Sequence, residues 1–126
     1  METKYTALGK PITHFERLDP IPTRCKVVRY HSDQLTSACP VTGQPDFYEV
    51  AITIETDGTA IETKTLKLYL ETYRNQQTFC EDLCVKICED LFDACQPQKC
   101  TVVLQQRRRG GIEITATHDI ARAERG

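Results

Sequence analysis

The stretch that decides the fold class is 99-KCTVVLQQRRRGGIEITATH-118, near the end of a chain of 126 residues. Residues 99–107 and 111–118 each alternate apolar and polar side chains, which is typical of half-buried β-strands. The intervening RRGG supplies two glycines for a turn, so the two runs predict a β-hairpin. The residues after 118 are expected to form a short polar tail.

Two amphipathic helices are expected before this hairpin. Residues 64–75 (KTLKLYLETYRN) place leucines and tyrosines at helical spacing, which predicts a helix of about ten residues. Residues 78–95 (TFCEDLCVKICEDLFDAC) repeat such a pattern. Thr78, with Glu81 three positions later, resembles a capping box, so this second helix is expected to begin at Thr78 and to end before Pro97.

The upstream part of the chain predicts two more strands. They are TRCKVVRYHS (23–32) and DFYEVAITIET (46–56), with a proline- and glycine-containing loop over 33–45. Residues 1–22 are expected to form an N-terminal arm. The order ββααββ predicts an α+β domain over 23–126, an antiparallel four-stranded sheet with both helices on one face. The other face is expected to be apolar and covered by self-association.

Composition and charge exclude several classes of function. The formal charge of -2 gives no basic surface for bulk nucleic-acid binding, so direct binding of nucleic acid is not expected. No apolar run is long enough to span a membrane, and METKYTALGK lacks the apolar centre of a signal peptide. A cytoplasmic location is therefore expected.

The seven cysteines are expected to be reduced thiols, since no secretory signal precedes them. Cys80, Cys84 and Cys88 recur every four residues, which would place them on one face of the second helix. Paired zinc knuckles have a different spacing, so no metal site is expected. Buried cysteine behaves as a small hydrophobic residue, and a core position is expected for this stripe.

Cys39 lies in a different setting, the loop 35-LTSACPVTGQPDFYEV-50. Small neighbours leave the thiol accessible and offer backbone N–H groups, which favours a reactive thiolate. Asp46 follows seven residues later, and the turn-forming loop can bring it back beside the thiol. A carboxyl there is suited to donating a proton to a substrate atom. From these residues alone, a nucleophile and an ordinary loop thiol both remain open.

Several charged residues are candidates for ligand binding. Glu62, Lys64 and Lys67 cluster at the start of the first helix, where lysines are suited to phosphate but a solvated helix start is equally open. Glu81 can cap its helix or accept two parallel N–H bonds from a guanine-like edge. Arg109 at the hairpin is either exposed or an anion ligand.

Three stretches together resemble one family. TSACPVTGQPDF is similar to its cysteine loop, ETKTLKLYLETYRN to its helix signature, and RRGGIEI to its hairpin motif. The family is QueF, the NADPH-dependent reductases of 7-cyano-7-deazaguanine. The resemblance runs in the correct order from about residue 33 to 117. One departure is Cys80, which stands where many members have histidine.

The resemblance implies an enzyme of queuosine biosynthesis with a covalent mechanism. Cys39 would add to the nitrile carbon and form a thioimide, and Asp46 would donate the proton. Two hydrides from NADPH would then give 7-aminomethyl-7-deazaguanine. The implied substrate-binding residues are Ile61, Glu62, Thr63, Phe79, Cys80 and Glu81. The implied NADPH-binding residues are Lys64, Lys67 and Arg109, acting across a subunit boundary, and no metal is implied.

The family fold is the tunnelling fold, whose subunits close side by side into β-barrels. The resemblance therefore implies a homo-oligomer, a decamer of two pentamers. A related alternative is a QueF-like amidinotransferase, which acts on the nitrile base in tRNA with ammonia in place of hydride. Lys64 and Lys67 favour the reductase. A cyclohydrolase of the same fold would need zinc ligands, and no suitable spacing of histidine and cysteine is apparent. A non-catalytic purine-binding protein would leave Cys39 and Asp46 without a role.

Overall fold

The computed structural model describes residues 5–125, in which four strands are followed by two helices, two further strands and a short helix. They are β1 (Pro20–Pro22), β2 (Val27–Ala38), β3 (Pro45–Glu55), β4 (Thr59–Ile61), α1 (Thr63–Glu71), α2 (Cys80–Cys95), β5 (Lys99–Arg109), β6 (Ile112–Ala121) and α3 (Arg122–Arg125).

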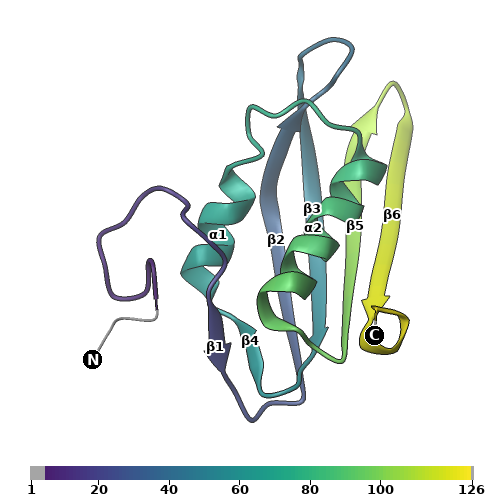
Figure 1. The fold of residues 1–126 in the computed structure, drawn as a ribbon. Helices are drawn as coiled ribbons and strands as arrows, with labels where there is room; N and C mark the ends of the chain where they lie inside the picture. Colours follow the sequence, from purple (N-terminus) through teal and green to yellow (C-terminus); the bar gives the residue numbers. More distant parts are fainter. Residues whose placement is uncertain (1–4, 126) are drawn as a thin grey trace.

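A four-stranded sheet with the order β2-β3-β5-β6 forms one layer, and all of its neighbours pair antiparallel. Helices α1 and α2 lie on the same face of this sheet (Figure 1). The short strands β1 and β4 pair with each other in a separate antiparallel sheet. The predicted α+β class, with two helices and antiparallel strands, is confirmed. The predicted element order omitted β1 and β4, which are too short to show an alternating pattern.

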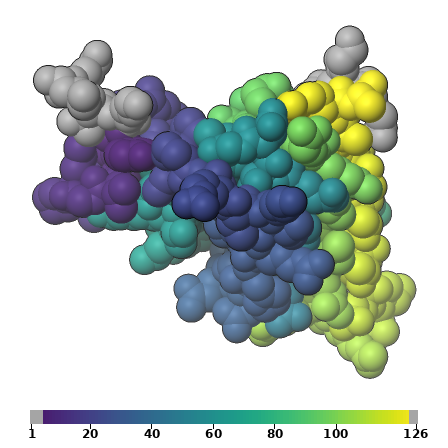
Figure 2. Space-filling model, turned by 90° about the horizontal axis from the view of Figure 1, so that it is seen from below, coloured from purple at the N-terminus to yellow at the C-terminus, as the bar shows by residue number. Residues whose placement is uncertain are grey.

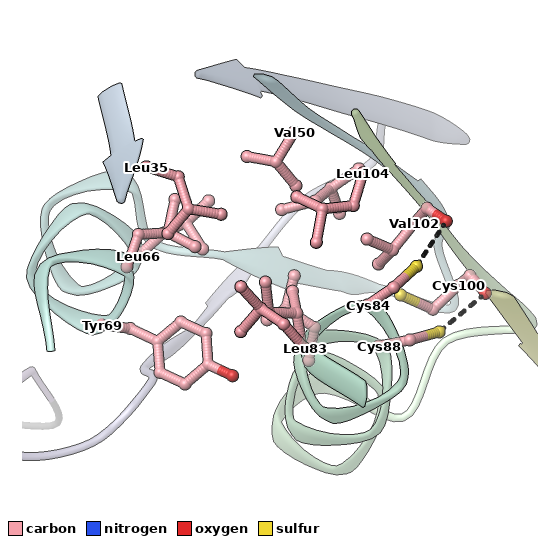
Figure 3. Packing of buried hydrophobic residues seen from close by; sticks show 14 of the residues in the cluster. Leu35, Val50, Leu66, Tyr69, Leu83, Cys84, Cys88, Cys100, Val102 and Leu104 are labelled. Atoms are coloured by element: carbon pink, nitrogen blue, oxygen red, sulfur yellow. Dashed lines mark hydrogen bonds between the residues drawn. The ribbon is translucent and has the colours of Figure 1, made fainter. Parts of the chain in front are cut away.

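The core lies between the sheet and α2. Every second residue of β3 from Tyr48 to Ile54 is buried, and these side chains meet buried residues of α2 such as Leu83, Ile87 and Leu91 (Figure 3). Burying one such side chain contributes about 1.5–3 kcal/mol. The expectation that the opposite face is apolar is wrong, because the alternate residues of β3 there are Phe47, Glu49, Ala51, Thr53 and Glu55.

The cysteine stripe of α2 belongs to this core, as predicted. The Cys84 thiol donates a hydrogen bond to the carbonyl of Val102 at 3.4 Å, and Cys88 donates to that of Cys100 at 3.4 Å (Figure 3). Helix α2 is thus joined to β5 by thiol hydrogen bonds as well as by apolar packing. All seven cysteines are free thiols.

Strand β2 is longer than predicted. Residues 33–45 were expected to form a loop, but the strand continues to Ala38 and only six residues separate it from β3. The pairing of β2 with β3 shifts register between Ser32 and Leu35, and regular pairing resumes at Leu35. Backbone pairing with a neighbouring strand therefore outweighs the polar composition of this segment.

The predicted capping box at Thr78 is also wrong. Helix α2 begins at Cys80, and its N-cap residue Phe79 makes no side-chain capping bond. The backbone N–H of Thr78 donates instead to the carbonyl of Ala38, next to a parallel β-bridge between Ala38 and Gln77. The predicted polar tail differs as well, since β6 runs to Ala121 and α3 follows it.

The N-terminal segment projects to one side of the sheet (Figure 2). It is tied down by Asp19, whose buried carboxylate accepts hydrogen bonds from Thr6 and Arg17. Residues 1–4 of the predicted arm lie outside the described residues, and its boundary at residue 22 stays a prediction. Within residues 5–125, no helix is long and apolar enough to cross a membrane.

Candidate active site

The loop between β2 and β3 holds Cys39 in a closed turn. Its backbone N–H donates to the carbonyl of Gln44 at 2.8 Å, and its carbonyl accepts from the N–H of Gly43 at 2.9 Å. Gly43 has a φ of 73°, a left-handed conformation that glycine adopts without strain. The loop therefore presents the thiol at the end of the sheet, partly exposed.

The environment of Cys39 stabilises its thiolate. Hydrogen bonds from the Thr42 hydroxyl, then from the backbone N–H groups of Thr42 and Val41, lower the pKa of the thiol to about 7. The Arg109 guanidinium makes a smaller contribution. A thiol with this pKa is a nucleophile near neutral pH, because the reactive form is the thiolate.

Asp46 lies next to this thiol, although it is buried. It is the second residue of β3 and pairs with Ser37, two residues before Cys39, and its exposed fraction is 4%. Arg109, at the end of β5, donates a hydrogen bond to the Asp46 carboxylate, and it is also among the groups that lower the pKa of the Cys39 thiol. The same guanidinium donates to the side-chain oxygen of Gln44 at 3.2 Å. One arginine thus connects the predicted nucleophile and the predicted acid.

The segment that enters α2 is joined to the residue before Cys39. The N–H of Ala38 donates to the carbonyl of Gln76 at 2.9 Å, and the carbonyl of Ala38 accepts from the N–H of Thr78 at 3.1 Å. This bridge brings the start of α2 to the same end of the molecule as the Cys39 loop (Figure 1). Phe79 is 53% exposed there, and Glu81 is exposed in the first turn of the helix.

Cys80 faces away from this exposed surface. Its thiol is 1% exposed and lies 3.8 Å from the carbonyl of Leu104, to which it donates. Burial is the main cause that raises the pKa of Cys80 to about 11, so the group is a neutral thiol. Beneath it, the buried hydroxyl of Tyr48 bonds that of Ser37 at 2.7 Å.

The predicted residues at the start of α1 form a second group, apart from the Cys39 loop in the single chain (Figure 1). The Glu62 carboxylate is buried and caps the helix, accepting from the N–H groups of Lys64 at 2.8 Å and Thr65 at 2.9 Å. Ile61 is buried beside it, and Thr63 is exposed. Glu62 therefore caps the start of α1, and the alternative interpretation, in which this carboxylate lies in solvent at the helix start, is wrong.

A cavity of about 330 Å³ lies between α1 and β2. Thr63 and Lys67 line it together with Arg74, Tyr30 and a floor of apolar residues. The Lys67 ammonium is exposed, and within residues 5–125 no hydrogen bond or ion pair engages it. The Lys64 ammonium donates to the backbone carbonyl of Lys10 in the N-terminal segment. These cations suit an anionic ligand.

The structure thus brings together Cys39, Asp46, Arg109, Phe79 and Glu81, and it separates them from the group at α1. Sequence reasoning missed Thr42, the main cause of the low Cys39 pKa. Thr42 could have been found from its position three residues after Cys39, because the first and last residues of a β-turn are three positions apart. Within residues 5–125, no three histidine, cysteine, aspartate or glutamate side chains are grouped to hold a metal ion.

The chain is similar to known proteins over most of its length. A family model described as QueF-like protein matches residues 45–125. A protein of Frankia casuarinae named NADPH-dependent 7-cyano-7-deazaguanine reductase is 38% identical over 115 residues, 89% of this chain and 92% of its own. A protein of the same name from Rhodopirellula baltica is 38% identical over 94 residues, 75% of this chain and 78% of its own.

A solved structure shows the same fold. The crystal structure of the archaeosine synthase QueF-Like in the apo form matches with a TM-score of 0.72 and 22% identity. The match covers 77% of this chain and 95% of that chain. At this identity the likeness concerns the fold alone.

Proposed function

This chain belongs to the family of QueF-like proteins, and from that membership we propose that it is an NADPH-dependent reductase of 7-cyano-7-deazaguanine. It converts the nitrile into the aminomethyl group of 7-aminomethyl-7-deazaguanine, a precursor of the tRNA base queuosine. The observation that carries the proposal is the Cys39 thiol, whose pKa is lowered to about 7 and which shares a guanidinium partner with the buried Asp46.

The first step is covalent. The Cys39 thiolate adds to the nitrile carbon, and a carbon–sulfur bond forms as one carbon–nitrogen π bond breaks. The electron pair of that π bond goes to nitrogen, which takes a proton from the carboxylic acid form of Asp46. The product is a thioimide joined to Cys39.

The remaining steps are reductions. Bound NADPH supplies a hydride twice, so that one nitrile, two NADPH and two protons give one primary amine and two NADP⁺. Between the two hydrides, the carbon–sulfur bond breaks and Cys39 leaves as a thiolate. A thiol of low pKa is a good leaving group, so the environment that activates Cys39 also assists its release.

Lys64, Lys67 and Arg109 are proposed to hold the phosphates of NADPH. The exposed Lys67 and the neighbouring Arg74 line a cavity whose volume, about 330 Å³, lies in the usual range of ligand pockets. Lys64 has further N–H donors beside the one given to Lys10. Arg109 has further N–H donors beside those given to Asp46 and Gln44.

Glu81 is proposed to read the guanine-like edge of the substrate, and Phe79 to stack on its ring. The Glu81 carboxylate is exposed, and no hydrogen bond or ion pair holds it among the described residues. A carboxylate accepts two parallel N–H bonds from such an edge. Cys80, buried and neutral, contributes to substrate binding only by fixing the first turn of α2 against β5.

Ile61, Glu62 and Thr63 are proposed to complete the site of a neighbouring subunit. In one chain the start of α1, which these residues flank, lies apart from the loop between β2 and β3 (Figure 1). Strands β2 and β6 are the two edges of the main sheet, so both offer free backbone groups for pairing with another copy. If the sheets of neighbouring chains closed into a barrel, in a decamer of two pentamers, the start of α1 of one chain would lie beside the Cys39 loop of the next chain.

The test is an assay of NADPH oxidation with the free nitrile base. Oxidation of two NADPH for each amine formed, together with a mass increase on Cys39 when NADPH is withheld, is the expected result. A Cys39→Ala variant is the control and forms no adduct. Consumption of ammonia on nitrile-bearing tRNA, without loss of NADPH, would instead establish the amidinotransferase.

A further inference from the structure

The hydroxyl of Tyr30 joins the main sheet to the strand that leads into α1. Tyr30 lies on β2, and its Oη accepts a hydrogen bond from the backbone N–H of Ile61 at 2.9 Å. The same oxygen donates its proton to the carbonyl of Ile61 at 2.8 Å. A tyrosine hydroxyl can donate and accept at once. One side chain therefore occupies both backbone polar groups of a residue 31 positions away.

Ile61 needs such a partner because β4 is an edge strand on this side. Among the described residues, β4 pairs with β1 alone and with no strand of the main sheet. The N–H of Glu62 donates to the carbonyl of Asp19, just before β1, at 2.9 Å. Neighbouring residues of a strand direct their polar groups to opposite sides, so those of Ile61 face away from β1. Ile61 is 2% exposed, so without Tyr30 these groups would be buried and unpaired.

The residues that follow Ile61 are joined to it closely. Glu62 is the next residue, and its carboxylate accepts from the N–H groups of Lys64 at 2.8 Å and Thr65 at 2.9 Å. The side chain of Ile61 belongs to the buried core. The place of Ile61 therefore determines where α1 begins and where the side chains of its first turns lie.

Tyr30 also lines the cavity between α1 and β2, together with Thr63 and Lys67. Its ring is half-buried and packs against the core. Burial is the main cause that raises the pKa of Tyr30 above its ordinary value, so the hydroxyl keeps the proton that it donates to Ile61. The hydroxyl thus connects two walls of the cavity, β2 and the segment that begins α1.

We propose that Tyr30 is a positioning residue, which holds the ligand-binding start of α1 at a fixed place beside β2 by bonding both backbone polar groups of Ile61. The inference rests on the proposed function, since it takes Thr63 and Lys67 as residues that bind substrate and NADPH. Tyr30 acts through them and not on the reacting atoms. A misplacement of about 1 Å can cost about 100-fold at such a site.

The test uses Tyr30→Phe, which keeps the ring and removes only the hydroxyl. Hydrogen exchange, read by mass spectrometry on peptides that contain Ile61, measures the bond itself. We expect the Ile61 amide to exchange about tenfold faster in the variant than in the parent. We expect KM for NADPH to rise about tenfold with kcat unchanged, the pattern of lost binding. NADPH titrated without the nitrile should show the same loss of affinity.

Tyr73→Phe is the matched control. Its hydroxyl is also buried and bonds that of Tyr69 at 2.7 Å, but it does not line the cavity formed by the described residues. We expect KM for NADPH to be unchanged in this variant. Circular dichroism and gel filtration verify the fold and assembly of each variant. Tyr30→Met, which also lacks the hydroxyl, replaces the phenylalanine variant if that one does not fold.

Alkylation of Cys39 by iodoacetamide shows whether the nucleophile is disturbed. It is measured in a Cys25→Ser background, because the remaining five thiols are buried. We expect equal rates in parent and Tyr30→Phe, since the Cys39 loop is closed by its own backbone hydrogen bonds. A slower alkylation together with a lower kcat would overturn the inference, because the effect would then be a general change of structure.

Unchanged affinity for NADPH in folded Tyr30→Phe would overturn the inference, as would an equal loss in Tyr73→Phe. An Ile61 amide that exchanges equally fast in parent and Tyr30→Phe would overturn it too, because the bond would then hold nothing in place.

The NADPH titration separates the inference from the proposed activity. A parent that binds NADPH but reduces no nitrile, with weaker binding in Tyr30→Phe, would refute the reductase and leave the assignment of Tyr30 standing. Unchanged binding in Tyr30→Phe of an active reductase would refute the assignment alone. A parent that binds no NADPH would overturn both.

Discussion

Arg109 donates a hydrogen bond to the carboxylate of Asp46, 63 positions away in the sequence. The pair ties the end of β5 to the start of β3, and it does so beside the Cys39 thiol. The Asp46 side chain is almost fully buried, whereas the Arg109 side chain is 34% exposed. An anion that draws Arg109 away would leave the buried Asp46 side chain without its ionic partner.

Replacing Asp46 by asparagine removes the proton donor but keeps the size of the side chain. We expect turnover to fall by about 10²–10⁴-fold, the usual contribution of general acid catalysis. Thermal unfolding should change little, since Arg109 is partly exposed and can be solvated. The measurement is kcat for NADPH oxidation, and full activity in Asp46→Asn would remove the assigned role.

Replacing Glu81 by glutamine tests recognition of the ring. The amide presents an N–H group where the carboxylate would accept one, so we expect the nitrile concentration for half-maximal adduct formation to rise about 100-fold. Glu89→Gln, an exposed position of the same helix, is the control and should behave as the parent. If Glu81→Gln and Glu89→Gln needed the same nitrile concentration for half-maximal adduct formation, Glu81 would not be the residue that binds the guanine-like edge.

Replacing Lys67 by methionine tests the dinucleotide site. We expect KM for NADPH to rise about tenfold through loss of one phosphate contact. Adduct formation with the nitrile alone should be unchanged, because Lys67 lies in the other group of residues. Lys26→Met, which is also exposed, is the control. A rise in the nitrile requirement with no change in KM for NADPH would contradict the assignment.

Replacing Asp19 by asparagine tests the anchoring of the N-terminal segment. Burial alone raises the pKa of Asp19, but hydrogen bonds from Thr6 and Arg17 outweigh it, and the pKa lies below its ordinary value. The carboxylate therefore stabilises the folded state above the ordinary aspartate pKa, and this stabilisation is lost as the pH falls through the lowered folded value.

At pH 7 we expect Asp19→Asn to lower the free energy of unfolding by about 1–3 kcal/mol. The difference from the parent should shrink below about pH 4, where the ordinary carboxyl is protonated. Chemical denaturation at several pH values measures both effects. Asp33→Asn, an exposed carboxylate on β2, should show neither.

The parts of the fold with strong periodicity could be predicted from the sequence. Strand β3 was expected over 46–56 and runs over Pro45–Glu55, while α1 was expected from residue 64 and begins at Thr63. Residues 33–38 could not be assigned, because their pairing depends on β3 and not on their own pattern. The start of α2 was predicted wrongly for a similar reason, since Gln77 forms a long-range bridge with Ala38 and the N–H of Thr78 donates to the Ala38 carbonyl.

The candidate site was predictable only where its partners are close in sequence. The turn over residues 39–44 returns the chain, so the approach of Asp46 to Cys39 could be expected from the loop itself. Arg109 could be expected to bind an anion, but nothing local shows that the anion is Asp46. The burial of Cys80 could be expected from the stripe of cysteines on α2, but its hydrogen bond to the Leu104 carbonyl of β5 could not.

The two backbone hydrogen bonds of Ala38 fix the distance between the proposed nucleophile Cys39 and the proposed ring-binding residues at the start of α2. They join the residue before the nucleophile to the backbone just before Phe79, so the two parts keep one spacing whatever side chains they carry. If Phe79 and Glu81 contact the ring as proposed, substitutions there would change which ring groups are bound, whereas the main chain would set the distance from the ring edge to Cys39. An altered ring size would therefore require an insertion or deletion at one of these two junctions, rather than a point mutation.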